Sequence, residues 1–107
     1  MLESRQQAGT LVLTCQFERL DAAKASAFRE AFNQHSESVN GRVVLDFSKV
    51  RFVDSTGLGA VVACLKARSG RGELALAGLN GAVADLFRLT RLDGVFSIFE
   101  TVDDALG

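Results

Sequence analysis

The feature that most constrains the fold is the alternation of short apolar runs with segments of helical periodicity in the C-terminal half of the chain. Apolar residues dominate 43–47, 73–77 and 95–99, and the two intervening segments carry apolar residues three and four positions apart. Strands that alternate with helices pair in parallel through right-handed crossovers. The sequence therefore predicts an α/β domain with a mixed, largely parallel sheet of about four to five strands and about four helices.

The N-terminal segments add a strand and a helix to this pattern. Residues 10–17 alternate as in a strand that buries one face more than the other. Asp21 is the predicted N-cap of the following helix, which we expect to end between residues 37 and 41. Residues 1–9 are polar and form either a weak first strand or a flexible lead, within one domain that spans residues 1–107. The apolar positions of the helix are Ala22, Ala25, Phe28 and Phe32.

The remaining elements follow from periodicity and from capping residues. The 43–47 run is nearly continuous apolar sequence, which is typical of a central strand covered on both faces. The helix after it is expected to end at Gly70 and Gly72, while Asn80 caps a third helix and Thr101 begins a short last one. The predicted buried stripe of the second helix consists of Leu58, Val61, Val62 and Leu65.

Composition and charge exclude several classes of partner. The formal net charge of −1 gives no basic surface for nucleic acid. The longest apolar stretch, 58–65, is far shorter than a membrane span, and no secretory leader opens the sequence. We therefore expect a cytoplasmic protein with no direct membrane insertion. Cys15 and Cys64 lie alone in apolar segments and are predicted to be reduced core thiols.

Chemistry-bearing side chains concentrate in 53–59, the run VDSTGLG, where a predicted strand leads into a helix. Side-chain oxygens of Asp, Ser and Thr accept hydrogen bonds from the free N–H groups of a helix start, and the positive end of the helix dipole tolerates added negative charge. Ser55 is therefore able to carry a phosphate. Helix-terminus physics alone leaves three roles open for it: a catalytic nucleophile, a cap or a phosphate acceptor.

The common enzyme arrangements each lack a part. A hydrolase elbow needs a glycine two residues before the serine, where this chain has Val53, and the only imidazole, His35, lies near the end of another helix. Asp54 resembles the phosphate acceptor of a receiver domain, but the companion acidic pair and late lysine are absent. No phosphate-binding loop or metal-ligand spacing is present. We predict a protein without catalytic activity, cofactor or metal.

The run 44–59, VLDFSKVRFVDSTGLG, resembles the signature of the STAS domains, and in particular of the bacterial anti-sigma factor antagonists, with their D-S-[ST]-G-L-G helix start. The resemblance covers nearly the whole chain. Weaker matches are Leu20-Asp21 before the first helix, the strand 74–79, and 95–99 followed by 103–106. One position departs from the family pattern, since Glu18 stands where a glycine usually precedes the first helix.

The resemblance implies a partner switch. In such antagonists the unphosphorylated form binds an ATP-dependent anti-sigma factor serine kinase, and the kinase phosphorylates the first serine of the motif, here Ser55. A serine phosphatase of the metal-dependent type removes the phosphate. A phosphate adds about −1.5 to −2 charges, which a packed interface disfavours beside Asp54. The residues expected to contact the partner are Asp21, Asp54, Thr56, Gly57 and Leu58.

Two alternatives of another class share the fold. One is a constitutive STAS subunit of a larger assembly, such as a lipid-transport ABC system, in which the phosphate-acceptor motif is often incomplete. The other is a stressosome-like scaffold subunit, which usually carries a further domain. The intact Asp54-Ser55 pair favours the phosphorylation-controlled switch.

Overall fold

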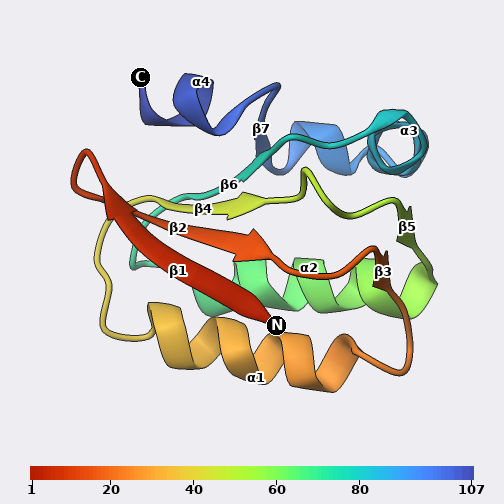
Figure 1. Ribbon diagram of the computed structural model, residues 1–107, viewed down its shortest axis with the longest axis horizontal. Helices are drawn as coiled ribbons and strands as arrows, with labels where there is room; N and C mark the ends of the chain where they lie inside the picture. Colours follow the sequence, from red (N-terminus) through yellow and green to blue (C-terminus); the bar gives the residue numbers. More distant parts are fainter.

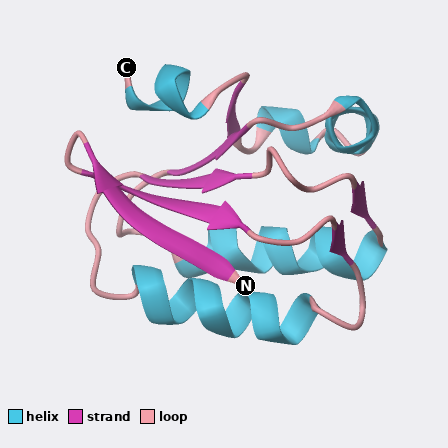
Figure 2. Ribbon diagram, in the orientation of Figure 1, coloured by secondary structure: helices cyan, strands magenta, loops and turns pink.

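The computed structural model describes residues 1–107 as a three-layer domain, with one short helix on one face of a sheet and two long helices on the other (Figures 1 and 2). No helix has the length and apolar character that crossing a membrane requires. The strands are β1 Leu2–Gln7, β2 Thr10–Cys15, β3 Arg19–Leu20, β4 Val43–Asp46, β5 Phe52–Val53, β6 Leu74–Ala77 and β7 Ser97–Phe99. The helices are α1 Ala25–Ser36, α2 Ser55–Ala67, α3 Gly81–Leu89, the 3₁₀ turn η1 Leu92–Gly94 and α4 Val102–Leu106.

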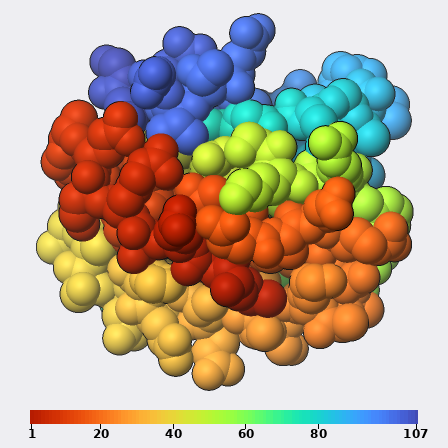
Figure 3. Space-filling view, viewed as in Figure 1, coloured from red at the N-terminus to blue at the C-terminus, as the bar shows by residue number.

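The main sheet has the strand order β1-β2-β4-β6-β7. β1 is antiparallel to β2, and the three other pairings are parallel, which confirms the predicted mixed, largely parallel sheet. β4 is the central strand, as its continuous apolar sequence predicts. The polar lead forms the edge strand β1, and Figure 3 shows it lying across the front of the molecule. β3 and β5 form a separate parallel pair of two residues each.

The two faces of the sheet bury different cores. On one face, side chains of the strands pack with α1, α2 and α3 into a cluster of 20 buried residues, among them Leu13, Leu45 and Leu76. The alternate positions, such as Val12 and Val44, form a smaller cluster of 5 with Ala105 of α4. Both faces of β4 are therefore covered, and this explains why its sequence lacks the polar alternation of a one-sided strand.

Several element boundaries differ from the prediction. α1 begins at Ala25 and not at Asp21, because residues 22–24 form a turn whose N–H groups at Lys24 and Ala25 donate to the Asp21 carbonyl. The N-cap is Lys24, with no side-chain hydrogen bond, so the predicted Asp21 cap is wrong. β2 ends at Cys15, and β7 begins at Ser97 because the chain first makes the turn η1.

The buried face of α2 is shifted by one position from the predicted stripe. Its fully buried residues are Gly57, Ala60, Val61 and Cys64. Of the predicted stripe, only Val61 is fully buried, whereas Leu58, Val62 and Leu65 are half-buried at its flank. Small residues at the buried positions let α2 pack closely against α1.

Arg68 continues the buried face of α2 beyond its last turn and is only 2% exposed. Its guanidinium donates to the carbonyls of Ser36 at 2.9 Å, Val39 at 2.7 Å and Gly41 at 2.5 Å. One side chain therefore satisfies three acceptors in the connection between α1 and β4. The charge is held by carbonyl dipoles and has no carboxylate partner.

Cys15 and Cys64 are buried free thiols, as predicted. Burial raises the pKa of Cys64 to about 12, despite the opposing effect of Arg29, and it raises the pKa of Cys15 further, with help from Asp46. Both groups are therefore neutral in the folded chain at ordinary pH.

These thiols predict a loss of stability at alkaline pH. Above their ordinary pKa of 9.0 the thiols ionise only in the unfolded chain, so the unfolded state binds fewer protons and is favoured as pH rises. At about pH 10 we expect a loss of about 1.4 kcal/mol per thiol in the free energy of unfolding. Urea titrations from pH 7 to pH 10 measure it, with Cys64→Ala as control. An unchanged pH slope in Cys64→Ala would contradict the assignment.

Candidate functional site

Asp54 organises the start of α2 and is its N-cap, in extended backbone conformation. Its Oδ1 accepts a hydrogen bond from the Gly57 N–H at 2.8 Å, and its Oδ2 accepts one from the Ala22 N–H at 3.2 Å. The Asp54 N–H in turn donates to the Leu20 carbonyl at 3.2 Å. Asp54 therefore ties the loop after β3 to the first turn of α2.

Ser55 is the first residue of α2 and is exposed to solvent. Because Asp54 supplies the cap, the Ser55 hydroxyl is not needed as one, and no side-chain hydrogen bond holds it. Of the three roles that the sequence leaves open, the cap belongs to Asp54. Thr56 is also exposed, at the second position of the helix, and it does not cap the helix either.

Gly57 is buried and permits a close contact between α2 and strand β3. A Cβ added here would lie 2.1 Å from the backbone oxygen of Leu20. The backbone that closely approaches this glycine is therefore that of Leu20, a segment of the same chain. Leu58 is half-buried and packs against the main core.

We predict that Gly57→Ala destabilises the domain by about 1–3 kcal/mol, since the backbone must move to accommodate the methyl group. Gly59 is the matched control, because it lies in the same helix with nothing within 4 Å of its added Cβ. Gly59→Ala should stabilise by about 0.5–1 kcal/mol through helix propensity. Urea unfolding midpoints test both. A stabilising Gly57→Ala would show that the close approach to Leu20 does not constrain the helix start.

Asp21 lies in the same loop as Ala22, beside the start of α2. Its Oδ2 is 3.7 Å from Nε of Arg19, and its Oδ1 is buried without a hydrogen-bond partner. Through the Ala22–Asp54 contact, the structure brings the loop that contains Asp21 to the DSTGL run. The five predicted contact residues and Ser55 thus gather at one end of the domain, although Gly57 is buried there.

A second group of side chains surrounds this end, and the sequence singled out only Glu18 among them. The β3–β5 pair places Arg19 opposite Phe52, with the guanidinium 4.1 Å from the ring centroid. Glu18 is exposed and lies 3.5 Å from Arg51 Nε, so the residue that replaces the family's usual glycine forms a surface ion pair. Strand alternation next to the buried Val53 is the signal that would have identified Phe52 as an outward residue.

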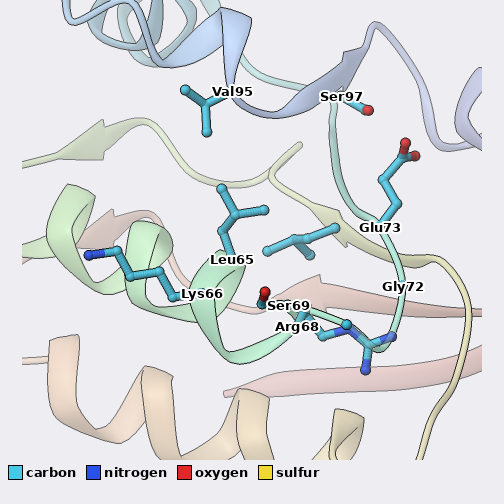
Figure 4. A pocket seen from close by; sticks show the side chains of 10 residues that line it. Leu65, Lys66, Arg68, Ser69, Gly72, Glu73, Val95 and Ser97 are labelled. Atoms are coloured by element: carbon cyan, nitrogen blue, oxygen red, sulfur yellow. The ribbon is translucent and has the colours of Figure 1, made fainter.

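The largest groove of the molecule, about 800 Å³, lies elsewhere. It is lined by Lys66, Glu73 and Val95, among others, at the C-terminal end of α2 (Figure 4). At about 1.5 Å per residue, its α2 residues lie about 15 Å or more along the helix from Ser55. Glu73 is paired with Arg42 at 2.7 Å, and Arg68 is occupied by carbonyls. No group of three or more His, Cys, Asp or Glu side chains converges on a metal-sized site.

A family model and curated relatives identify the family of this chain. The STAS domain model matches residues 1–105. The anti-sigma-B factor antagonist of Listeria monocytogenes is 32% identical over 80 residues, which are 74% of this chain and 70% of that protein. The crystal structure of an anti-sigma factor antagonist from Mycobacterium paratuberculosis has a TM-score of 0.89 at 24% identity, covering 99% of this chain and 90% of that one. The phosphorylated form of the Bacillus protein SpoIIAA has a TM-score of 0.70 at 19% identity, covering 99% of this chain and 96% of its own.

Proposed function

The chain belongs to the STAS domain family, and we propose that it is an anti-sigma factor antagonist whose binding to a serine kinase is switched by phosphorylation of Ser55. The unphosphorylated chain binds an ATP-dependent anti-sigma factor kinase and so releases the factor that the kinase holds. The kinase transfers phosphate to Ser55, and the complex dissociates. A metal-dependent serine phosphatase returns the chain to its binding form.

The proposal rests on the different roles of Asp54 and Ser55 at the start of α2. Asp54 takes the structural role of the cap, which leaves the neighbouring Ser55 hydroxyl exposed and without a structural task. An acceptor serine needs this accessibility, because the kinase must bring the γ-phosphate of ATP in line with the hydroxyl oxygen. Of the two exposed hydroxyls, family resemblance assigns the acceptor role to Ser55 over Thr56.

The same geometry accounts for the direction of the switch. The helix N-terminus carries a partial positive charge and free backbone N–H groups, so a phosphate on Ser55 is tolerated within the free domain. In a packed interface, about −1.5 to −2 charges beside the Asp54 carboxylate must be desolvated without a new partner. Phosphorylation therefore weakens binding without unfolding the chain. The Listeria relative is named an anti-sigma-B factor antagonist, and this name supports an anti-sigma factor as the partner of this chain.

The residues predicted to contact the kinase act in two ways. Thr56 is exposed and available for direct contact, while Asp21, Asp54 and Leu58 are partly exposed at the edge of the same surface. Gly57 is buried and contributes indirectly, by letting Leu20 of β3 lie close to α2.

A phosphate-mapping experiment tests the proposal. The purified chain is incubated with ATP and, one at a time, with the purified anti-sigma-type serine kinases of its source organism, and the product is digested and analysed by mass spectrometry. We expect one kinase to add a single phosphate, located on Ser55. Phosphate on another residue, or no phosphate with any of the kinases, would contradict the proposed switch.

A further inference from the structure

A small groove lies between β5 and α3, at the same end of the domain as Ser55. Its volume is about 230 Å³, below the range of about 300–1,000 Å³ that is typical of small-molecule sites. A space of this size accommodates one or two side chains of a protein partner. The lining residues, five of them apolar, are Arg51, Phe52, Val53, Ala82, Val83 and Leu86.

Phe52 forms an exposed rim of this groove. It is 40% exposed, and it is one of four large apolar side chains on the surface of the molecule, with Met1, Leu89 and Val95. The Arg19 guanidinium stacks over its ring, and the β3–β5 pairing fixes the two residues side by side. An aromatic ring that is held in place before binding loses little conformational entropy when a partner binds. Aromatic and arginine side chains are also enriched among the residues that contribute most of the binding energy of protein interfaces.

The groove is continuous with the surface around Ser55. Val53 lines it and Ser55 begins α2 two residues later, after the Asp54 cap. Figure 1 shows β5 leading into α2 with α3 on the other side of it, and Figure 3 shows the segments around residues 20, 50 and 80 meeting at this end. Stable interfaces cover about 800 Å² on each partner. A kinase that covers Ser55 over such an area therefore covers the groove as well.

The charged side chains around the groove indicate which chemical groups a partner would place there. Arg19 and Arg51 are 59% and 75% exposed, and their carboxylate partners Asp21 and Glu18 lie 3.7 and 3.5 Å away. Exposed pairs of this length contribute about 1 kcal/mol at most, so both guanidinium groups can exchange to a carboxylate of a partner. The groove thus fits an apolar side chain that is accompanied by an acidic one.

We infer that the groove between β5 and α3 is a second docking site for the kinase, which inserts an apolar side chain against Phe52 and places a carboxylate beside Arg51. The inference rests on the proposed function. Contacts in this groove, and not those at the Ser55 motif, supply a large share of the difference in affinity between one kinase and another. Glu18 takes part as the surface partner of Arg51.

The test uses steady-state phosphorylation by the purified kinase that labels Ser55, with Phe52→Ala, Arg51→Glu and, as a matched control, Val95→Ala. Val95 is also an exposed apolar residue, 58% exposed, but it lines the distant groove at the other end of α2. We expect KM for the chain to rise about tenfold or more in Phe52→Ala and Arg51→Glu, with kcat within about twofold, because the acceptor is unaltered. Val95→Ala should match the wild type.

Melting curves establish that each variant is folded. Arg51 is exposed, so Arg51→Glu changes the charge beside the groove without altering the core. Wild-type KM in both folded variants, with Ser55 still phosphorylated, would overturn the second docking site and leave the switch intact. A wild-type chain that no kinase phosphorylates would overturn the switch and this inference together. An equal rise in KM for Val95→Ala would show that the effect is not specific to this groove.

Discussion

A chain with Ser55→Ala stays bound to its kinase in the presence of ATP and takes up no phosphate, whereas the wild type is phosphorylated and released. The hydroxyl is the only group removed, and it forms no hydrogen bond within the domain, so the fold and the unphosphorylated interface remain intact. We expect the effect to be all or none for phosphorylation. Size-exclusion chromatography of the mixture with ATP, followed by mass measurement, detects both outcomes.

Ser55→Asp gives the converse result. It adds a negative charge beside Asp54, and like charges held together in an interface cost several kcal/mol, so the kinase should bind at least about tenfold more weakly. Ser69→Ala is the matched control, because Ser69 is an exposed serine at the opposite end of α2. Ser69→Ala should be phosphorylated and released like the wild type. Phosphate uptake by Ser55→Ala would assign the acceptor role to another residue.

The second large effect is on stability, at Arg68. Replacing this side chain by methionine keeps most of its apolar stem and removes the guanidinium that donates to the carbonyls of Ser36, Val39 and Gly41. A buried acceptor that loses its donor costs about 1–3 kcal/mol, a substantial share of the about 5–15 kcal/mol that stabilises a typical domain. We therefore expect a large fall in the urea midpoint and loosening of the connection between α1 and β4.

Arg71 provides the control for Arg68. It also donates to a carbonyl, that of Glu37, but it is exposed to solvent, and water can replace it. Arg71→Met should lower the free energy of unfolding by less than about 1 kcal/mol. Equal losses for the two variants would mean that burial of the Arg68 guanidinium does not set its contribution.

Periodicity predicted the mixed, largely parallel main sheet and the central place of β4, because these depend on which side chains are buried along each segment, but it did not predict the short pair β3–β5. Capping was predictable where one polar side chain faces the first turn, as at Asn80 and Thr101. It failed at Asp21, where residues 22–24 form a turn before the helix begins and the Ala22 N–H donates to Asp54, 32 residues away in sequence. A local pattern contains no information on such a contact.

Arg68 shows a different limit of sequence reasoning. It lies four residues after Cys64 on the buried face of α2, so helical spacing marks the position as buried, but charge argues for exposure. Only the fold reveals that three carbonyls of another segment converge there. At the site, the motif predicted Ser55 and Asp54 but not the Phe52 groove, because α3 approaches β5 only through the tertiary fold.

Isothermal titration calorimetry tests the switch by comparing the affinity of the kinase for two forms of the same chain, unphosphorylated and fully phosphorylated on Ser55. We expect the unphosphorylated form to bind and the phosphorylated form to bind at least about tenfold more weakly. Treatment of the phosphorylated form with a metal-dependent serine phosphatase should restore binding. Equal affinities for the two forms would contradict the switch.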